Sequence, residues 1–89
     1  MHIDRVDTYG NEWVAFVRVR TDDGAEGWGQ VAPYNADVTA EVLHRQVAPH
    51  ALGMDPLDPQ AVATRVLDAE HKFPGSYVCR ALVGVDTAL

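Results

Sequence analysis

The stretch VRVRTDDGAEGWGQ, residues 17–30, decides the fold of this chain. Valines alternate with arginines at its start, which is the period of two that turns one side of a β-strand toward a core. The turn Asp22-Asp23-Gly24 tolerates positive φ, so it predicts a tight hairpin after which residues 25–31 return as an antiparallel strand. The two glycines beside Trp28 indicate that backbone or a bulky side chain approaches closely there, or that the strand bends sharply.

Residues on the N-terminal side extend the hairpin to a three-stranded antiparallel meander. The strand of the valines is expected to run from Trp13 to Thr21, with one face made of Trp13, Ala15, Val17 and Val19. An earlier strand is predicted over residues 3–9, and its buried side is expected to carry Ile3, Val6 and Tyr9. Gly10 and Asn11 form the turn between the two strands.

The periodicity then changes to that of helices. Asp37 is the expected N-cap of a first helix that Pro49 ends or kinks, with an apolar face of Val38, Val42, Leu43 and Val47. Asp58 as N-cap and Pro59 at the first helical position open a second helix, which runs to about Glu70 with a face of Val62, Val66, Leu67 and Ala69. After a loop over residues 71–75, a third helix carries an apolar stripe of Val78, Ala81, Leu82, Val85, Ala88 and Leu89. Strands followed by helices predict one α+β domain over residues 1–89, a three-stranded meander followed by a three-helix bundle.

The last helix shows no closing signal. It carries Asp86 in its last turn and has no Gly or Asn after the stripe. We therefore expect that the chain is truncated at Leu89 and that the stripe was made to be covered by protein that is absent.

Composition limits the partners. The net charge is −6 and Lys and Arg form no cluster, which argues against nucleic acid. No apolar run approaches the ~20 residues that cross a bilayer, and the start of the chain lacks the pattern of a signal peptide, so we expect a soluble, cytoplasmic protein without a membrane partner.

The chain offers little chemistry of its own. The four histidines have no metal-ligand spacing, so no metal site is expected from this chain alone. The single cysteine, Cys79, is expected to be a small buried or half-buried apolar residue. The Gly-x-Gly at residues 27–29 has no third glycine and no helix directly after it, which argues against a phosphate loop. No catalytic residue is predicted.

Three segments together carry a family resemblance. Residues 17–30, Gly53-Met54-Asp55-Pro56 and the segment RALVGVDTAL at residues 80–89 resemble, in this order, the N-terminal capping domain of the mandelate racemase/muconate lactonizing enzyme group of the enolase superfamily. The resemblance implies a longer enzyme in which an absent (β/α)8 barrel binds Mg²⁺ and abstracts the proton α to the carboxylate of a small substrate. It further implies an acid-sugar dehydratase or a racemase/epimerase, homo-oligomeric when full-length. The chain has one lysine, Lys72, so the family's K-x-K motif is not here, and the 89 residues should be inactive and bind no cofactor by themselves.

The capping role makes loop residues the candidate site. By analogy with the family, the loops Tyr9 to Trp13 and Val31 to Asp37 close over the barrel mouth, and the substrate-binding candidates are Tyr9, Asn11, Pro33, Tyr34 and Asn35. Plain packing or contact with another domain is the alternative role of Tyr34. For the whole protein, a cycloisomerase, an amino-acid epimerase and a non-enzymatic interaction module are the alternatives.

Overall fold

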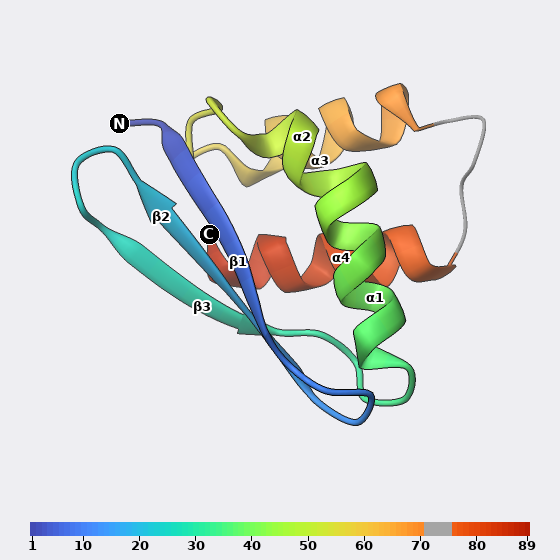
Figure 1. Cartoon of the computed structure of the whole chain (residues 1–89). Helices are drawn as coiled ribbons and strands as arrows, with labels where there is room; N and C mark the ends of the chain where they lie inside the picture. Colours follow the sequence, from blue (N-terminus) through green and yellow to red (C-terminus); the bar gives the residue numbers. More distant parts are fainter. Residues whose placement is uncertain (71–75) are drawn as a thin grey trace.

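A computed structural model of the chain describes residues 1–70 and 76–89 and has the predicted α+β architecture. Strands β1 (Ile3–Gly10), β2 (Ala15–Thr21) and β3 (Glu26–Gln30) form an antiparallel sheet in the order β1-β2-β3. The helices gather on one side of this sheet (Figure 1). They are α1 (Ala36–Val42), the π-helical η1 (Leu43–Val47), α2 (Ala48–Ala51), α3 (Pro59–Ala69) and α4 (Ser76–Ala88).

The first strand departs from the prediction at Tyr9. Ile3 and Val6 are both buried although they are three residues apart, because the register with β2 shifts between Ile3 and Arg5. No second shift follows, so Tyr9, three residues beyond Val6, lies on the opposite face and is 44% exposed. The placement of Tyr9 on the buried side is therefore wrong. The placement of Trp13 on the buried face of the second strand is also wrong, because Trp13 lies in the turn before β2 and is exposed.

The glycines of β3 lie where a helix backbone meets the sheet. A Cβ added at Gly27 would be 1.9 Å from the carbonyl oxygen of Ala88, and one added at Gly29 would be 2.4 Å from that of Gly84. Gly84 of α4 has no room either, since its Cβ would be 2.6 Å from Val31. Of the two predicted reasons for these glycines, the close approach of backbone is confirmed.

The helical stretch after the sheet begins two residues earlier than predicted and continues beyond Pro49. Asn35, not Asp37, is the N-cap, so Thr39 faces the core while Val38 is exposed. In a regular α-helix the ring of Pro49 would collide with the carbonyl four residues before it. The π-helical turn of η1, in which Ala48 donates its N–H to the carbonyl of Leu43, widens the helix just before the proline.

The second predicted helix, α3, is confirmed at its start. Asp58 is the N-cap and accepts a hydrogen bond from the N–H of Ala61 at 3.2 Å. Val62 and Val66 are buried as predicted, whereas Leu67 and Ala69 are exposed, so the buried face is narrower than the pattern indicated. The predicted loop over residues 71–75 lies outside the described residues.

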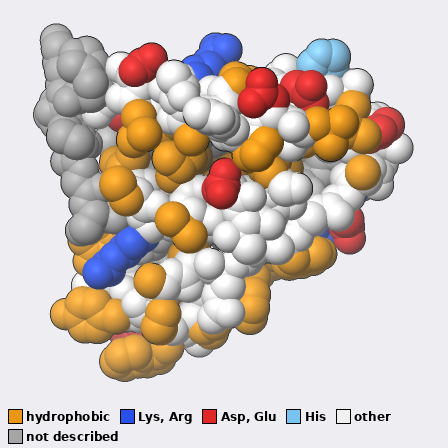
Figure 2. Space-filling model, turned by 180° about the vertical axis from the view of Figure 1, so that it is seen from behind, with side chains coloured by type: hydrophobic (Ala, Val, Ile, Leu, Met, Phe, Trp, Pro, Cys, Tyr) orange, Lys and Arg blue, Asp and Glu red, His pale blue; other side chains and the backbone are white. Residues whose placement is uncertain are grey.

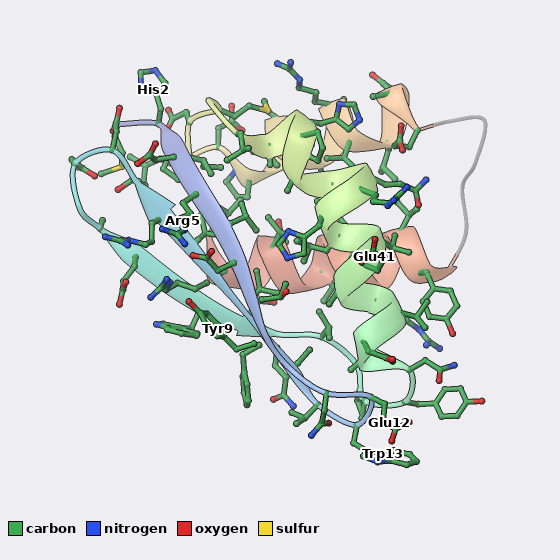
Figure 3. All side chains as sticks on the ribbon, viewed as in Figure 1. His2, Arg5, Tyr9, Glu12, Trp13 and Glu41 are labelled. Carbon is green, nitrogen blue, oxygen red and sulfur yellow. The ribbon has the colours of Figure 1, made fainter. Side chains whose placement is uncertain are left out.

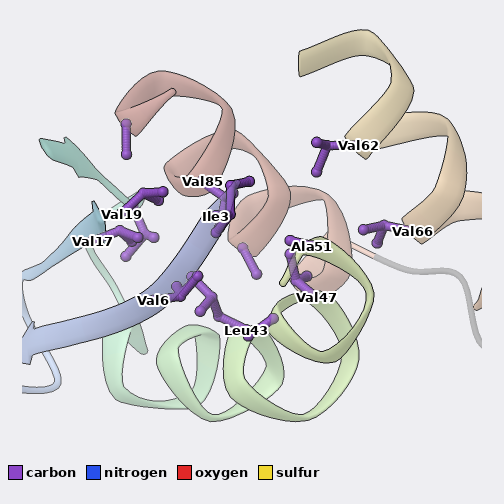
Figure 4. Close-up of a cluster of buried hydrophobic side chains, with 14 of the residues drawn as sticks. Ile3, Val6, Val17, Val19, Leu43, Val47, Ala51, Val62, Val66 and Val85 are labelled. Atoms are coloured by element: carbon purple, nitrogen blue, oxygen red, sulfur yellow. The ribbon is translucent and has the colours of Figure 1, made fainter. Parts of the chain in front are cut away.

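The apolar stripe of α4 is covered by this chain itself. Val78, Ala81, Val85 and Ala88 are all at most 6% exposed. The helix packs on β2, β3, α1 and η1, and Figure 4 shows Val85 beside Val17, Val19 and Ile3. The expectation that this stripe needs absent protein to cover it is therefore wrong. The stripe is the part of α4 that closes the core between the sheet and the other helices.

Candidate functional site

Two loops lie side by side at one end of the sheet, and we call them the loop pair: residues 11–14 between β1 and β2, and residues 31–35 between β3 and α1. They are joined by a hydrogen bond from the N–H of Ala36 to the carbonyl of Glu12 at 3.0 Å. Within the first loop, the side-chain oxygen of Asn11 accepts from the N–H groups of Trp13 and Val14. Figure 3 shows Glu12 and Trp13 at the tip of this loop, beside the start of α1.

The second loop contains two consecutive residues in the left-handed region. Tyr34 has φ 69° and Asn35 has φ 54°. Asn tolerates this conformation, but for Tyr it costs about 1–2 kcal/mol. The Asn35 side chain donates from Nδ2 to the hydroxyl of Tyr77, at the start of α4, at 3.0 Å. Tyr34 itself remains 64% exposed, so its side chain is accessible to a ligand.

A cavity of about 200 Å³ lies between the end of β1 and α1. It is bordered by Thr8, Tyr9, Gly10, Asn11, Ala15, Asp37, Ala40, Glu41 and His44. Thr8 Oγ1 and His44 Nε2 are 2.8 Å apart on one side of it. Because the carboxylates of Asp37 and Glu41 also border the cavity, its potential favours hydroxyl or amino groups over a carboxylate.

The ring of Tyr9 belongs to the outer face of the sheet, which the helices do not cover. It lies 5.7 Å from the ring of Trp28, and the guanidinium of Arg18 lies 5.3 Å from the Tyr9 ring and 5.6 Å from the Trp28 ring. Asp7 accepts hydrogen bonds from Arg18 and Arg5, each at 2.9 Å. Burial alone would raise the pKa of Asp7, but these hydrogen bonds and the charges of both arginines outweigh burial and lower that pKa.

The structure thus separates the five predicted site residues. Asn11, Pro33, Tyr34 and Asn35 belong to the loop pair, and Tyr9 borders the cavity while its ring lies with the outer-face cluster. Neither Tyr77 nor Arg80 is among the five predicted site residues; the Arg80 guanidinium lies 5.2 Å from the centre of the Tyr77 ring. No local pattern could have revealed the Asn35–Tyr77 contact, because its partners are 42 positions apart.

The described parts of the chain provide no site for a metal ion. Among residues 1–70 and 76–89, His, Cys, Asp and Glu form no group of three or more that could hold one. A Mg²⁺ ion therefore does not fit the residues described. Within the same ranges, no helix combines the length and apolar character that crossing a membrane requires.

A shallow apolar groove of about 330 Å³ runs between α3 and α4, lined by Ala63, Leu67, Cys79, Leu82, Val83 and Asp86. Figure 2 shows the molecule from behind, where hydrophobic side chains gather over much of the surface. Cys79 is exposed in this groove, so the prediction of a buried or half-buried cysteine is wrong.

Comparison with known proteins agrees with the resemblance of the three segments. D-galactonate dehydratase from Xanthomonas campestris pv. campestris (strain B100) is 29% identical over 91 residues, which cover 100% of this chain and 24% of that enzyme. A crystal structure from Roseobacter denitrificans, of a protein provisionally named a racemase, is 56% identical with a TM-score of 0.95 and covers 99% of this chain and 24% of its own. A mandelate racemase/muconate lactonizing protein from Paracoccus denitrificans PD1222, solved with magnesium, is 27% identical with a TM-score of 0.83 and covers 96% of this chain and 25% of its own.

The chain spans about a quarter of the length of these relatives. The family described as "Mandelate racemase / muconate lactonizing enzyme, N-terminal domain" matches residues 2–89, which is nearly all of the chain. Together with the α+β fold, this match shows that the chain belongs to the N-terminal domains of the mandelate racemase/muconate lactonizing enzyme family, in the enolase superfamily.

Proposed function

We propose that this chain is the capping part of an enzyme that removes the proton α to a carboxylate and dehydrates an acid sugar. The observation that carries the proposal is the match of the whole chain to D-galactonate dehydratases, together with the family match over residues 2–89. Racemisation is the second candidate, because the 56% identical Roseobacter denitrificans protein is provisionally named a racemase.

In this proposal the loop pair closes over the substrate and excludes water from the reacting centre. Tyr34 offers an exposed ring and hydroxyl, and the loop that carries it is tied to the first loop through the Ala36–Glu12 hydrogen bond. Exposed carboxylates of Glu12 and Asp37 stand in and beside the loop pair. Because they would repel a carboxylate, we infer that the loop pair contacts the hydroxyl-bearing end of the substrate.

The remaining chemistry belongs to polypeptide outside these 89 residues. Since the described residues form no metal-ligand group, the Mg²⁺ expected for such an enzyme would be held elsewhere. A homo-oligomeric assembly and a cytoplasmic location are part of the same proposal.

The test uses the protein translated from the complete reading frame that contains these codons. It is incubated with Mg²⁺ in D₂O and a panel of acid sugars that includes D-galactonate, and α-proton exchange and product formation are followed by NMR. We expect turnover of at least one acid sugar and, for Tyr34→Ala, a KM raised about tenfold, which corresponds to the loss of about 1.4 kcal/mol of binding. Thr64→Val, on the exposed side of α3, is the control and should leave KM unchanged. A folded protein that neither exchanges the α-proton of any of these acids nor forms product from it would refute the enzymatic proposal and favour an interaction module.

A further inference from the structure

The contact between Asn35 and Tyr77 is a side-chain hydrogen bond between the loop before α1 and the start of α4. Asn35 ends the loop that carries Tyr34, and Tyr77 is the second residue of α4. Asn35 Nδ2 donates to the Tyr77 hydroxyl at 3.0 Å, and the Arg80 guanidinium lies 5.2 Å from the centre of the Tyr77 ring. Arg80 is one helical turn after Tyr77, so it holds the ring from the same face of α4. Arg80 thus orients the Tyr77 ring independently of the contact with the loop.

The loop needs such a contact because its backbone is strained. Two consecutive non-glycine residues with positive φ are unfavourable, and they persist only where the surroundings hold them. The backbone of this corner is held by hydrogen bonds from the N–H of Ala36 to the carbonyl of Glu12 and from the N–H and the hydroxyl of Thr39 to the carbonyl of Asn35. Those bonds fix the start of α1. The Tyr77 hydroxyl acts on the side chain of Asn35 itself, next to the strained Tyr34.

We propose that Tyr77 is a positioning residue: its hydroxyl holds Asn35 in the left-handed conformation and thereby directs the exposed ring of Tyr34 toward the substrate. This inference rests on the proposed capping function and names the residue that sets the geometry of the loop pair. Tyr77 acts through Asn35 and does not itself touch the reacting atoms. Its loss therefore weakens substrate recognition and leaves the chemical step in place.

Tyr77→Phe removes the hydroxyl and keeps the ring for Arg80. In the protein from the complete reading frame, we expect KM to rise about fivefold, the size of a neutral hydrogen bond's net effect on a conformational equilibrium, with kcat changed less than twofold. Thr64→Val also removes a hydroxyl, from an exposed position on α3, and should change neither constant. In an Asn35→Gly background, glycine adopts positive φ without the hydrogen bond to Tyr77, so Tyr77→Phe should have no further effect on KM.

A spectroscopic measurement separates this inference from the proposed function. Positive φ gives a strong intraresidue NOE between Hα and the amide proton, and we expect this signal at Tyr34 and Asn35 to weaken in Tyr77→Phe. An unchanged NOE overturns the positioning role, whatever the kinetics show. A weakened NOE with KM unchanged in an active enzyme overturns its link to the substrate. If the unaltered protein turns over no acid, it is the proposed function that has failed, and the substrate role of Tyr77 falls with it.

Discussion

Replacing Gly29 by Ala tests the contact on which the domain's packing depends. The new Cβ would lie 2.4 Å from the carbonyl oxygen of Gly84, 3.0 Å from the nitrogen of Ala88 and 3.1 Å from Cβ of Thr87. All three neighbours belong to α4, and the two nearest atoms are backbone, so no side chain can turn aside. The helix must move away from the sheet, and the buried side chains of its stripe must move with it.

The expected cost follows from two opposing terms. Overpacking of a well-packed interior costs about 1–3 kcal/mol, and a clash with rigid backbone belongs at the upper end of that range. Ala in place of Gly also stiffens the unfolded chain, which offsets about 0.4–1 kcal/mol. The net loss in the free energy of unfolding is therefore about 2–3 kcal/mol. For a chain of this size that corresponds to a Tm lower by roughly 10–20 °C.

The assay is urea unfolding followed by far-ultraviolet circular dichroism, with the m-value compared between variants to confirm that only stability has changed. Gly24→Ala is the matched control, since nothing lies within 4 Å of the added Cβ and only its positive φ opposes the change. Its cost should be clearly smaller than that of Gly29→Ala. If Gly29→Ala loses less than 0.5 kcal/mol, or no more than the control, the account of close helix-on-sheet contact is refuted.

Three further substitutions test the helices and the outer face. Val85→Ala, at a fully buried position of α4, should cost about 2 kcal/mol in urea unfolding, whereas Val83→Ala, 58% exposed on the same helix, should cost almost nothing; equal losses would contradict the buried stripe. Asp58→Ala should lower the free energy of unfolding by about 1 kcal/mol, and Asp58→Ser should restore most of it if the side chain acts as the N-cap. Because the pKa of Asp7 is lowered in the folded state, the ionised carboxylate adds to the free energy of unfolding above about pH 4, and this stabilisation is lost as the pH falls through the folded pKa. The urea midpoint should therefore fall less steeply with acid in Asp7→Asn than in the exposed control Asp4→Asn.

The sequence predicted those features that depend on local rules. Alternation in β2, the Asp-Asp-Gly turn and the Asp58-Pro59 start of α3 are each decided by residues within a few positions of one another. The glycines on either side of Trp28 also indicated a close contact, although only the structure shows that α4 is the partner.

The errors arise where tertiary packing overrides the pattern. Tyr9 turned outward because a single register shift near Ile3 changes which later residues of β1 face the core. Pro49 was expected to end or kink its helix; the helical stretch continues to Ala51 after the π-helical turn of η1. The stripe of α4 was correctly found but wrongly interpreted as uncovered, since periodicity identifies an apolar face and says nothing about which element covers it.

The two loops were predicted as the candidate site, and that role stays a prediction. Family resemblance pointed to the segments that the structure joins through Ala36 and Glu12, but the residues that hold Asn35 could not be found in this way. Tyr77 was not among the predicted site residues. Its hydroxyl gains a role from a partner distant in sequence, which a single sequence does not reveal.

Two of the contacts that α4 makes, one with the sheet and one with the loop before α1, should be coupled. Gly84 rests on Gly29 of the sheet, and Tyr77, seven residues or about 10 Å earlier along the same helix, holds Asn35. A helix moves as a rigid body, so the outward shift forced by Gly29→Ala should also pull the Tyr77 hydroxyl away from the loop. We expect the strong Hα–amide NOE of Asn35 to weaken in Gly29→Ala under conditions where the protein remains folded, and to stay unchanged in Gly24→Ala. If Gly29→Ala is destabilised while this NOE is intact, the packing of α4 and the geometry of the loop pair are independent.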